Sequence, residues 1–176
     1  MDTSKELNYK LYLHKANGFI RTSFNIEFER YAAIKSGNVE LVKENLAAIK
    51  KDFLAGKGRL SDDPVRNIRY HVIIAVAQVS RACVEGGMPH DVAYTLSDIY
   101  IQRADKCGIE SKLIEILEEM QLDFAARMKM LKKEEVISLH IRRCIDYIYE
   151  HLNEQITVKQ LSSHTNLNES YLSTLF

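Results

Sequence analysis

One segment of the chain carries both a start signal and a stop signal for a long helix. Asp63 is a favoured N-cap residue, and Pro64 after it suits the first helical position, where no N–H is needed. Gly86 and Gly87 are typical of a helix end. Residues 72–77 between these signals are apolar almost all round, which is typical of a helix surrounded by others. We therefore predict that this helix is the core of an all-helical fold.

Apolar residues recur at helical spacing in the neighbouring segments as well. Residues 23–36 predict one helix with Gly37 as its left-handed C-cap, and a second helix follows at once, so that the two form an αα-hairpin. The apolar face of this second helix is Val39, Val42, Leu46, Ile49 and Phe53. Another helix is predicted from Pro89 to Cys107. Its inward residues are Val92, Leu96, Ile99 and Tyr100. Residues 1–22 fit a helix and a strand equally well.

Residues 110–133 carry a narrow apolar seam with near-heptad spacing. Its members are Leu113, Leu117, Met120, Phe124, Met128 and Leu131. Such a seam suits one partner helix, either in the same chain or in a second copy. An intramolecular core face and a homodimer formed through Leu117, Met120 and Phe124 are both consistent with it.

Composition limits the compartment and the partners. The 24 basic and 24 acidic side chains cancel, so any contact with DNA must be local. The three cysteines, Cys83, Cys107 and Cys144, lack C-x-x-C spacing, which favours a reducing compartment. The first 19 residues do not resemble a signal peptide, and the longest apolar run is far short of the roughly 20 residues that cross a bilayer. We expect a soluble, cytoplasmic protein without a membrane partner.

The last 40 residues contain signals for two short helices after a longer one. The longer helix has an apolar face of Ile137, Ile141, Ile145, Ile148 and Leu152, and ends at Asn153 and Glu154. Thr157 and Gln160 fit a capping box for a helix that carries Val158 and Leu161 inward and ends near His164. Asn168 is a suitable N-cap for the last helix. Its residues Leu172, Leu175 and Phe176 are expected to pack on Leu161 and Ile148. Two short helices at this separation predict a helix-turn-helix, whose second helix enters the DNA major groove.

Three residue patterns in this segment resemble a known family. They are Ile141-x-x-Cys144-Ile145-x-Tyr147-Ile148, then Ile156-Thr157-Val158 to Leu161, then Asn168-x-x-Tyr171-Leu172-Ser173-x-Leu175-Phe176. They resemble the first helix-turn-helix of AraC-type (AraC/XylS) transcription regulators. The block from Pro64 to Asp105, with Glu85-Gly86-Gly87 and Leu96-Ser97-Asp98-x-Tyr100, is more loosely similar to the helical N-terminal domains of some bacterial members.

The resemblance implies a domain organisation and a function. Residues 1–133 are expected to form a helical-hairpin regulatory domain that senses an effector or mediates dimerisation, and residues 134–176 a partial AraC-type helix-turn-helix. The expected function is sequence-specific DNA binding in transcription regulation. The alternative is a free-standing helical module that binds a ligand or a protein and does not bind DNA.

The resemblance also implies DNA-contacting residues. Ser170, Ser173 and Thr174 match the base-reading positions, Asn168 and Glu169 match the start of the recognition helix near the backbone, and Lys159 lies on the helix that crosses the phosphates. Two departures affect this expectation. Ser162 stands where the family usually has a small Ala, and the family pattern continues past the position of Phe176 into basic residues, a linker helix and a second helix-turn-helix. We therefore expect a fragment or a natural truncation that binds DNA poorly.

Polar residues on the two central predicted helices suggest an effector pocket. The candidates are Arg66, Arg69, Arg81, Tyr94 and Asp98. Buried structural ion pairs that also involve Glu85 and Tyr100 explain the same residues equally well. The six histidines show no metal-ligand spacing, and the sequence lacks phosphate-binding loops and nucleophile motifs, so we expect no metal, no cofactor and no enzymatic activity.

Overall fold

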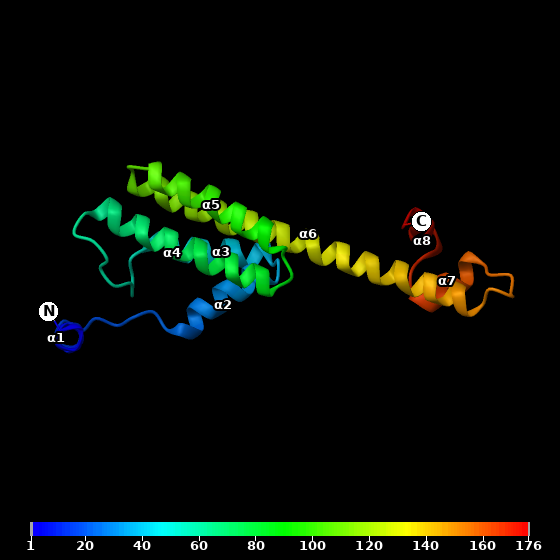
Figure 1. The fold of residues 1–176 in the computed structure, drawn as a ribbon, viewed down its shortest axis with the longest axis horizontal. Helices are drawn as coiled ribbons and strands as arrows, with labels where there is room; N and C mark the ends of the chain where they lie inside the picture. Colours follow the sequence, from blue (N-terminus) through cyan, green and yellow to red (C-terminus); the bar gives the residue numbers. More distant parts are fainter. Residues whose placement is uncertain (1, 176) are drawn as a thin grey trace. The chain divides into compact units, whose positions relative to one another are not determined.

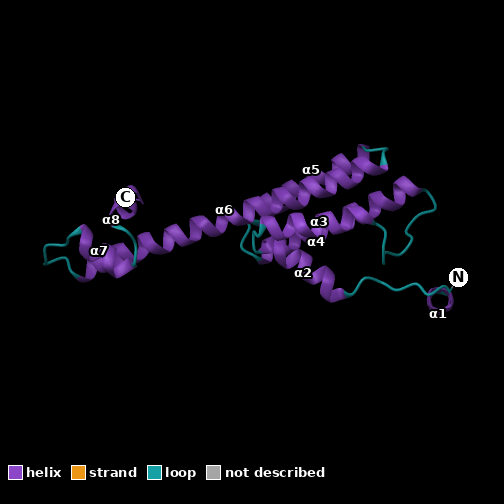
Figure 2. Cartoon of the chain, turned by 180° about the vertical axis from the view of Figure 1, so that it is seen from behind, coloured by secondary structure: helices purple, strands orange, loops and turns teal. Residues whose placement is uncertain are grey.

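The computed structural model describes residues 2–175, which contain helices and loops and no strand (Figure 2). Eight helices are present in this part of the chain, so the prediction of an all-α fold is confirmed. The chain divides into two compact units between Met128 and Lys129, and each is described here by itself. The sequence placed the boundary five residues later, after residue 133.

The first unit begins with α1 (Thr3–Ala16), so the segment that fitted a helix and a strand equally is a helix. Asp2 caps it, because its carboxylate accepts a hydrogen bond from the backbone N–H of Ser4 at 3.1 Å. None of its residues is buried. Isolated helices of this length are marginal in water, so α1 is the helix that tertiary packing supports least.

The predicted αα-hairpin consists of α2 (Phe24–Lys35) and α3 (Val39–Lys51). Gly37 adopts the left-handed conformation with φ 72°, as predicted for a C-cap. Asn38 then caps α3, because its Oδ1 accepts from the backbone N–H of Leu41 at 3.1 Å. The turn therefore follows from local residue chemistry.

The core helix is α4 (Pro64–Glu85), and α5 (His90–Lys106) lies beside it (Figure 1). Both predicted ends of α4 are confirmed: Asp63 Oδ1 accepts from the N–H of Arg66 at 2.6 Å, and Gly87 has φ 102°. The prediction that helices surround α4 on every side is wrong. Val72 and Val76 are fully buried, but Ile74 is 48% exposed, because its face of α4 has no neighbour to cover it.

The predicted inward face of α5 needs correction. Leu96 and Tyr100 are buried as expected, but Val92 and Ile99 are 43% and 49% exposed. The other buried positions of α5 are the small residues Ala93, Ser97 and Ala104. Small side chains let the backbones of α4 and α5 approach each other, and Ser80 Oγ donates across this contact to the carbonyl of Ala93 at 3.2 Å. Close packing therefore excludes the larger apolar residues.

Helix α6 (Glu110–Glu150) carries the near-heptad seam. Five of its six residues are buried, and Leu131 is half-buried. The intramolecular alternative is therefore the one observed for this face: Lys50 pairs with Glu118 at 2.7 Å, and Arg103 pairs with Glu119, so that α3 and α5 both flank it. The residues proposed for a dimer contact, Leu117, Met120 and Phe124, belong to the core of one chain.

In the second unit, α7 (Val158–Thr165) and α8 (Glu169–Leu175) pack against each other after the C-terminal part of α6. Helix α6 ends at Glu150, so Leu152 lies outside it and is exposed. Ile145 is also exposed, because it lies at the edge of the apolar stripe, and Cys144 takes the buried position. Val158 is exposed as well, since the buried and half-buried residues of α7 begin at Leu161. The predicted packing of Phe176 lies outside the described residues.

Across residues 2–175, no helix combines the length and the apolar character that a membrane crossing requires.

Candidate nucleic-acid interface

The start of α7 is built as the sequence predicted. The N–H of Gln160 donates to Thr157 Oγ1 at 3.3 Å, and the N–H of Thr157 donates to Gln160 Oε1 at 2.8 Å. These reciprocal bonds form a capping box, which satisfies backbone donors that a helix start leaves free. The capping box therefore determines where α7 begins.

The turn between α7 and α8 depends on Asn166 and Ser162. Asn166 is the one non-glycine residue among the described residues with a positive φ, 56°, and it closes α7 in the left-handed conformation. The N–H of Leu167 donates to the carbonyl of Ser162 at 3.1 Å, and Ser162 Oγ donates to the carbonyl of Leu167 at 2.5 Å. The hydroxyl that departs from the family pattern thus has a partner inside the turn.

A small buried core holds the two short helices. Leu172 of α8, Thr165 of α7 and Cys144 of α6 are buried, and Thr165 Oγ1 donates to the carbonyl of Leu161 at 2.8 Å. Burial raises the pKa of the Cys144 thiol, which keeps it protonated and unreactive at neutral pH. The sequence patterns did not predict the burial of Cys144, although Cys144 lies at helical spacing from Ile137, Ile141 and Ile148.

The exposed face of α8 carries the residues expected to read bases. Ser170, Ser173 and Thr174 are all exposed, as are Asn168 and Glu169. Asn168 Oδ1 accepts from the N–H of Ser170 at 2.8 Å, which confirms the predicted cap. Ser173 Oγ and Thr174 Oγ1 donate to the carbonyls of Glu169 and Ser170 at 3.0 and 2.9 Å. Their hydroxyl hydrogens are therefore occupied, while their oxygens can still accept.

Positive charge in this unit is sparse. Lys159 of α7 is exposed, and so are Arg142 and Arg143 of α6. Helix α8 itself carries one charged residue, Glu169. Within residues 129–176, six Lys and Arg residues are balanced by six Asp and Glu residues, so the net charge is zero. Because phosphate neutralisation dominates affinity for DNA, such a surface supports only weak binding.

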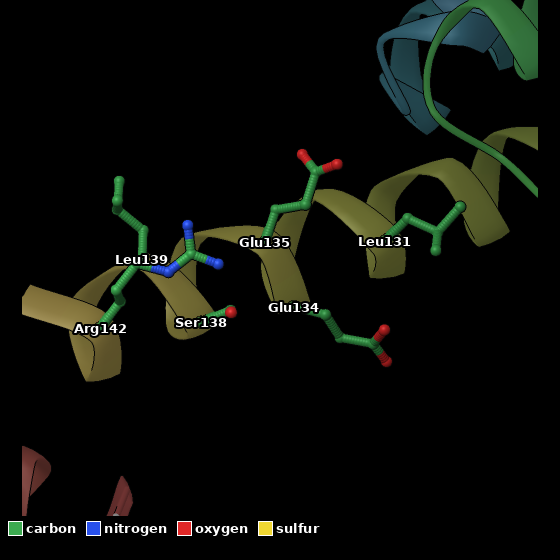
Figure 3. A pocket seen from close by; sticks show the side chains of 6 residues that line it. All are labelled: Leu131, Glu134, Glu135, Ser138, Leu139 and Arg142. Carbon is green, nitrogen blue, oxygen red and sulfur yellow. The ribbon is translucent and has the colours of Figure 1, made fainter. Parts of the chain in front are cut away.

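A hollow on α6 in the same unit offers no alternative site. All six of its lining residues come from this one helix, so no second element closes it. Figure 3 shows that Glu134 and Glu135 point away from each other, so their carboxylates do not converge on a ligand. Arg142, at the other end of the hollow, is about two helical turns farther along.

The five predicted effector residues do not form one site. Arg69 is committed to structure, because Nε and Nη2 donate to the carbonyls of Ala104 and Cys107 at 3.1 and 2.8 Å. The other four, Arg66, Arg81, Tyr94 and Asp98, are exposed. Across residues 2–175 no hydrogen bond or ion pair joins any two of the five side chains. The alternative of buried ion pairs is not observed there either: Glu85 pairs at the surface with Lys35 at 3.3 Å, and Tyr100 donates to Asp123 at 3.1 Å.

Two histidines of the second unit, His151 and His164, lie against the ring of Tyr147. The ring of Tyr147 lies 4.1 Å from that of His151 and 4.7 Å from that of His164, measured between centroids. Sequence analysis treated these histidines separately and missed this cluster, although the spacing of Tyr147 and His151 puts both on one helix face. No group of three His, Cys, Asp or Glu side chains in residues 2–175 is arranged to hold a metal ion.

Comparisons of the chain with protein-family models, curated proteins and solved structures found no match. The likeness to AraC-type regulators therefore depends on the residue patterns quoted above.

Proposed function

We propose that the chain belongs to a DNA-binding transcription regulator of the AraC type, with residues 134–176 as its first helix-turn-helix and α8 as the recognition helix. The observation that carries the proposal is the arrangement of α8. Leu172 is buried against the unit while Ser170, Ser173 and Thr174 face outward from a helix that Asn168 caps. A helix held from one side with short polar side chains on the other is suited to a major groove.

The proposed readout uses hydroxyl oxygens as acceptors. The exocyclic amino groups of adenine and cytosine are the donors that bases present in the major groove. Single hydroxyl contacts lack the bidentate geometry that discriminates a base pair by about 1–3 kcal/mol, so α8 would read its site with low specificity. Lys159 would contact phosphate and contribute affinity that does not depend on sequence.

The first unit is proposed as the sensing part of the regulator. A homodimer stays a prediction, and since the seam on α6 is buried, it would need another surface. The exposed aromatic side chains Phe24 and Phe28 on α2 are available for such a contact.

Backbone NMR shifts test the proposal on the full chain. A random-sequence DNA duplex is added at about 20 mM salt, where weak electrostatic binding is strongest. We expect shifts at Lys159, Ser170, Ser173 and Thr174, and none on α3 to α5. Lys159→Ala should weaken binding, whereas Lys112→Ala, which removes the same charge from an exposed position of the first unit, should not. Shifts confined to the first unit, or none at millimolar duplex, would refute the DNA-binding role.

The alternative is a helical ligand or interaction module without DNA binding. The overall charge balance favours it, and so does a hollow of about 400 Å³ between α2 and α4, lined by Phe24, Phe28 and Arg81 among others. The absence of any DNA-dependent shift in the experiment above would support this second reading.

A further inference from the structure

A small cavity in the first unit is lined by α2, α3, α4, α6 and the loop before α4. Its volume is about 50 Å³. A water molecule needs roughly 10–15 Å³ on this measure, so the cavity has room for about three or four atoms of that size. One wall is apolar and consists of Ile49, Phe53, Ala75 and Leu117. The cavity therefore fits a very small ligand with an apolar end.

The cavity lining also includes two cations, Lys57 and Arg30, and one carboxylate, that of Glu27. Lys57 Nζ donates to the carbonyl of Phe53 and lies 4.1 Å from the centroid of the Phe53 ring. Arg30 also lines the cavity and is half-buried. Among the described residues, neither Lys57 nor Arg30 has a carboxylate within ion-pair distance. Burial, with the nearby positive charge of Arg30, lowers the pKa of Lys57, while the nearby carboxylates of Glu27 and Asp52 act in the opposite direction. An anion between the two cations would offset both effects.

Neutral hydrogen-bond donors face the same space. Gln121 of α6 lines the cavity with only 6% of its surface exposed, and its side-chain amide can donate hydrogen bonds. Tyr31 contributes a hydroxyl from α2, and burial raises its pKa, so that the phenol stays protonated. Gln121 and Tyr31 therefore add neutral donors to the two cations that line this cavity.

The loop that carries Lys57 is held in place by close backbone contacts. The N–H of Thr22 donates to the carbonyl of Gly56 at 3.1 Å, and Gly56 has φ 66°. A Cβ on Gly58 would lie 2.9 Å from Arg21 Nη2. His71 Nε2 bonds the carbonyl of Gly58 at 2.9 Å, which ties the loop to α4. Lys57 is thus positioned before any ligand arrives, which lowers the entropic cost of binding.

We propose that this cavity binds a small monocarboxylate, with its carboxylate between Arg30, Lys57 and Gln121 and its short apolar end against Phe53 and Leu117. A planar carboxylate matches the forked guanidinium of an arginine side chain. Phosphate and sulfate also bind such a guanidinium, but these tetrahedral ions have no apolar end to contact Phe53 and Leu117. Glu27 also lines the cavity, and its negative charge repels a dianion more strongly than a monoanion. The site would give the proposed regulator an effector, yet its binding requires no DNA.

A titration of the full chain with sodium acetate tests the site. Backbone NMR shifts are followed against sodium chloride at equal ionic strength, and sodium phosphate is a third arm. We expect saturable shifts with acetate at millimolar concentration, centred on residues around Arg30, Lys57 and Gln121. Chloride and phosphate should give at most small shifts that do not saturate.

Two variants and one control locate the binding. Arg30→Gln and Gln121→Leu should each weaken acetate binding at least tenfold, because each removes a donor to the carboxylate. Arg66→Gln removes the same charge from an exposed position of α4 and should leave binding unchanged. If one cavity variant fails to fold, the other variant and the comparison of acetate with chloride and phosphate on the native chain still test the site.

Three results would overturn the site: shifts that acetate and chloride produce equally, shifts that do not saturate by about 100 mM, or a folded Arg30→Gln that binds as the native chain does. None of these results depends on whether α8 binds DNA.

Discussion

The guanidinium of Arg69 on α4 donates from Nη2 to the carbonyl oxygen of Cys107 at 2.8 Å, just past the end of α5. Its Nε donates to the carbonyl of Ala104 in the last turn, at 3.1 Å. The last carbonyls of a helix have no partner within the helix, and a cation there also opposes the negative end of the helix dipole. Arg69 therefore holds the end of α5 against the start of α4.

Replacement of Arg69 tests this role. Arg69→Met should lower the free energy of unfolding by about 2 kcal/mol, because hydrogen bonds from a charged donor contribute about 1.5–3 kcal/mol. Arg66→Met, one turn earlier and exposed, should change it by no more than about 0.5 kcal/mol. Urea unfolding followed by circular dichroism measures both. Equal stability of the two variants would contradict the role of Arg69.

Tyr100 should make the fold sensitive to alkaline pH. Burial and the Asp123 carboxylate raise the pKa of the Tyr100 phenol to about 12. In the unfolded chain the phenol titrates near pH 10, so the folded state keeps a proton that the unfolded state has lost. The resulting stabilisation is complete below about pH 10 and is lost as the pH rises toward 12.

The variant Tyr100→Phe removes this contribution. Its stability should therefore fall less steeply between about pH 10 and 11 than that of the native chain, by up to about 1.4 kcal/mol per pH unit. At neutral pH it should be less stable by about 1 kcal/mol, because the hydrogen bond to Asp123 is lost. Tyr94→Phe, at an exposed position of the same helix, is the matched control and should keep the native pH profile. The profile is measured by urea unfolding at a series of pH values.

The left-handed Asn166 should tolerate glycine and reject a branched side chain. Asn166→Gly is expected to change stability by less than about 0.5 kcal/mol, because glycine adopts a positive φ without a steric penalty. Asn166→Val should cost about 2 kcal/mol and release α8 from α7. Hydrogen exchange at the amides of Leu167 and Leu172 reports this local loss. Asn153→Val, in the exposed loop before α7, should leave those amides protected.

DNA affinity should respond differently to two kinds of substitution. Lys159→Ala should weaken all sequences alike and make the salt dependence shallower by about one unit, since one phosphate contact is lost. In a chain extended by a second helix-turn-helix, Ser173→Ala should leave the salt dependence unchanged. It should alter the difference in binding free energy between alternative bases at one base pair by about 1 kcal/mol. Fluorescence anisotropy on random and selected duplexes at two salt concentrations separates the effects. Tight, salt-insensitive binding by residues 1–176 alone would contradict the expected weak affinity.

The helix ends followed from the sequence. Asp63, Thr157 and Asn168 cap helices through hydrogen bonds to amides two or three residues away, and Gly37 closes α2 through its own backbone conformation. These interactions are complete within one helical turn, so residue type and spacing are sufficient to predict them. The exposed face of α8 was predicted for the same reason, because periodicity placed Leu172 opposite Ser170 and Thr174.

Which apolar residues are buried depended on the partner of each helix. Ile74, Val92, Ile99 and Val158 fit apolar faces in the sequence but are exposed, since only the contact between helices decides which part of a broad apolar face is covered. The seam on α6 was equally consistent with a second copy until its neighbours α3 and α5 were known.

The sequence by itself determined the all-helical class, the positions of the caps and the two-helix turn at the C-terminal end, because these depend on short-range hydrogen bonds and periodicity. The tertiary structure decided the role of Arg69 and the existence of the cavity. Arg30, Lys57 and Gln121 come from segments separated by up to 91 positions in the chain. No local pattern encodes such a meeting, because it depends on the packing of four helices and a loop at once.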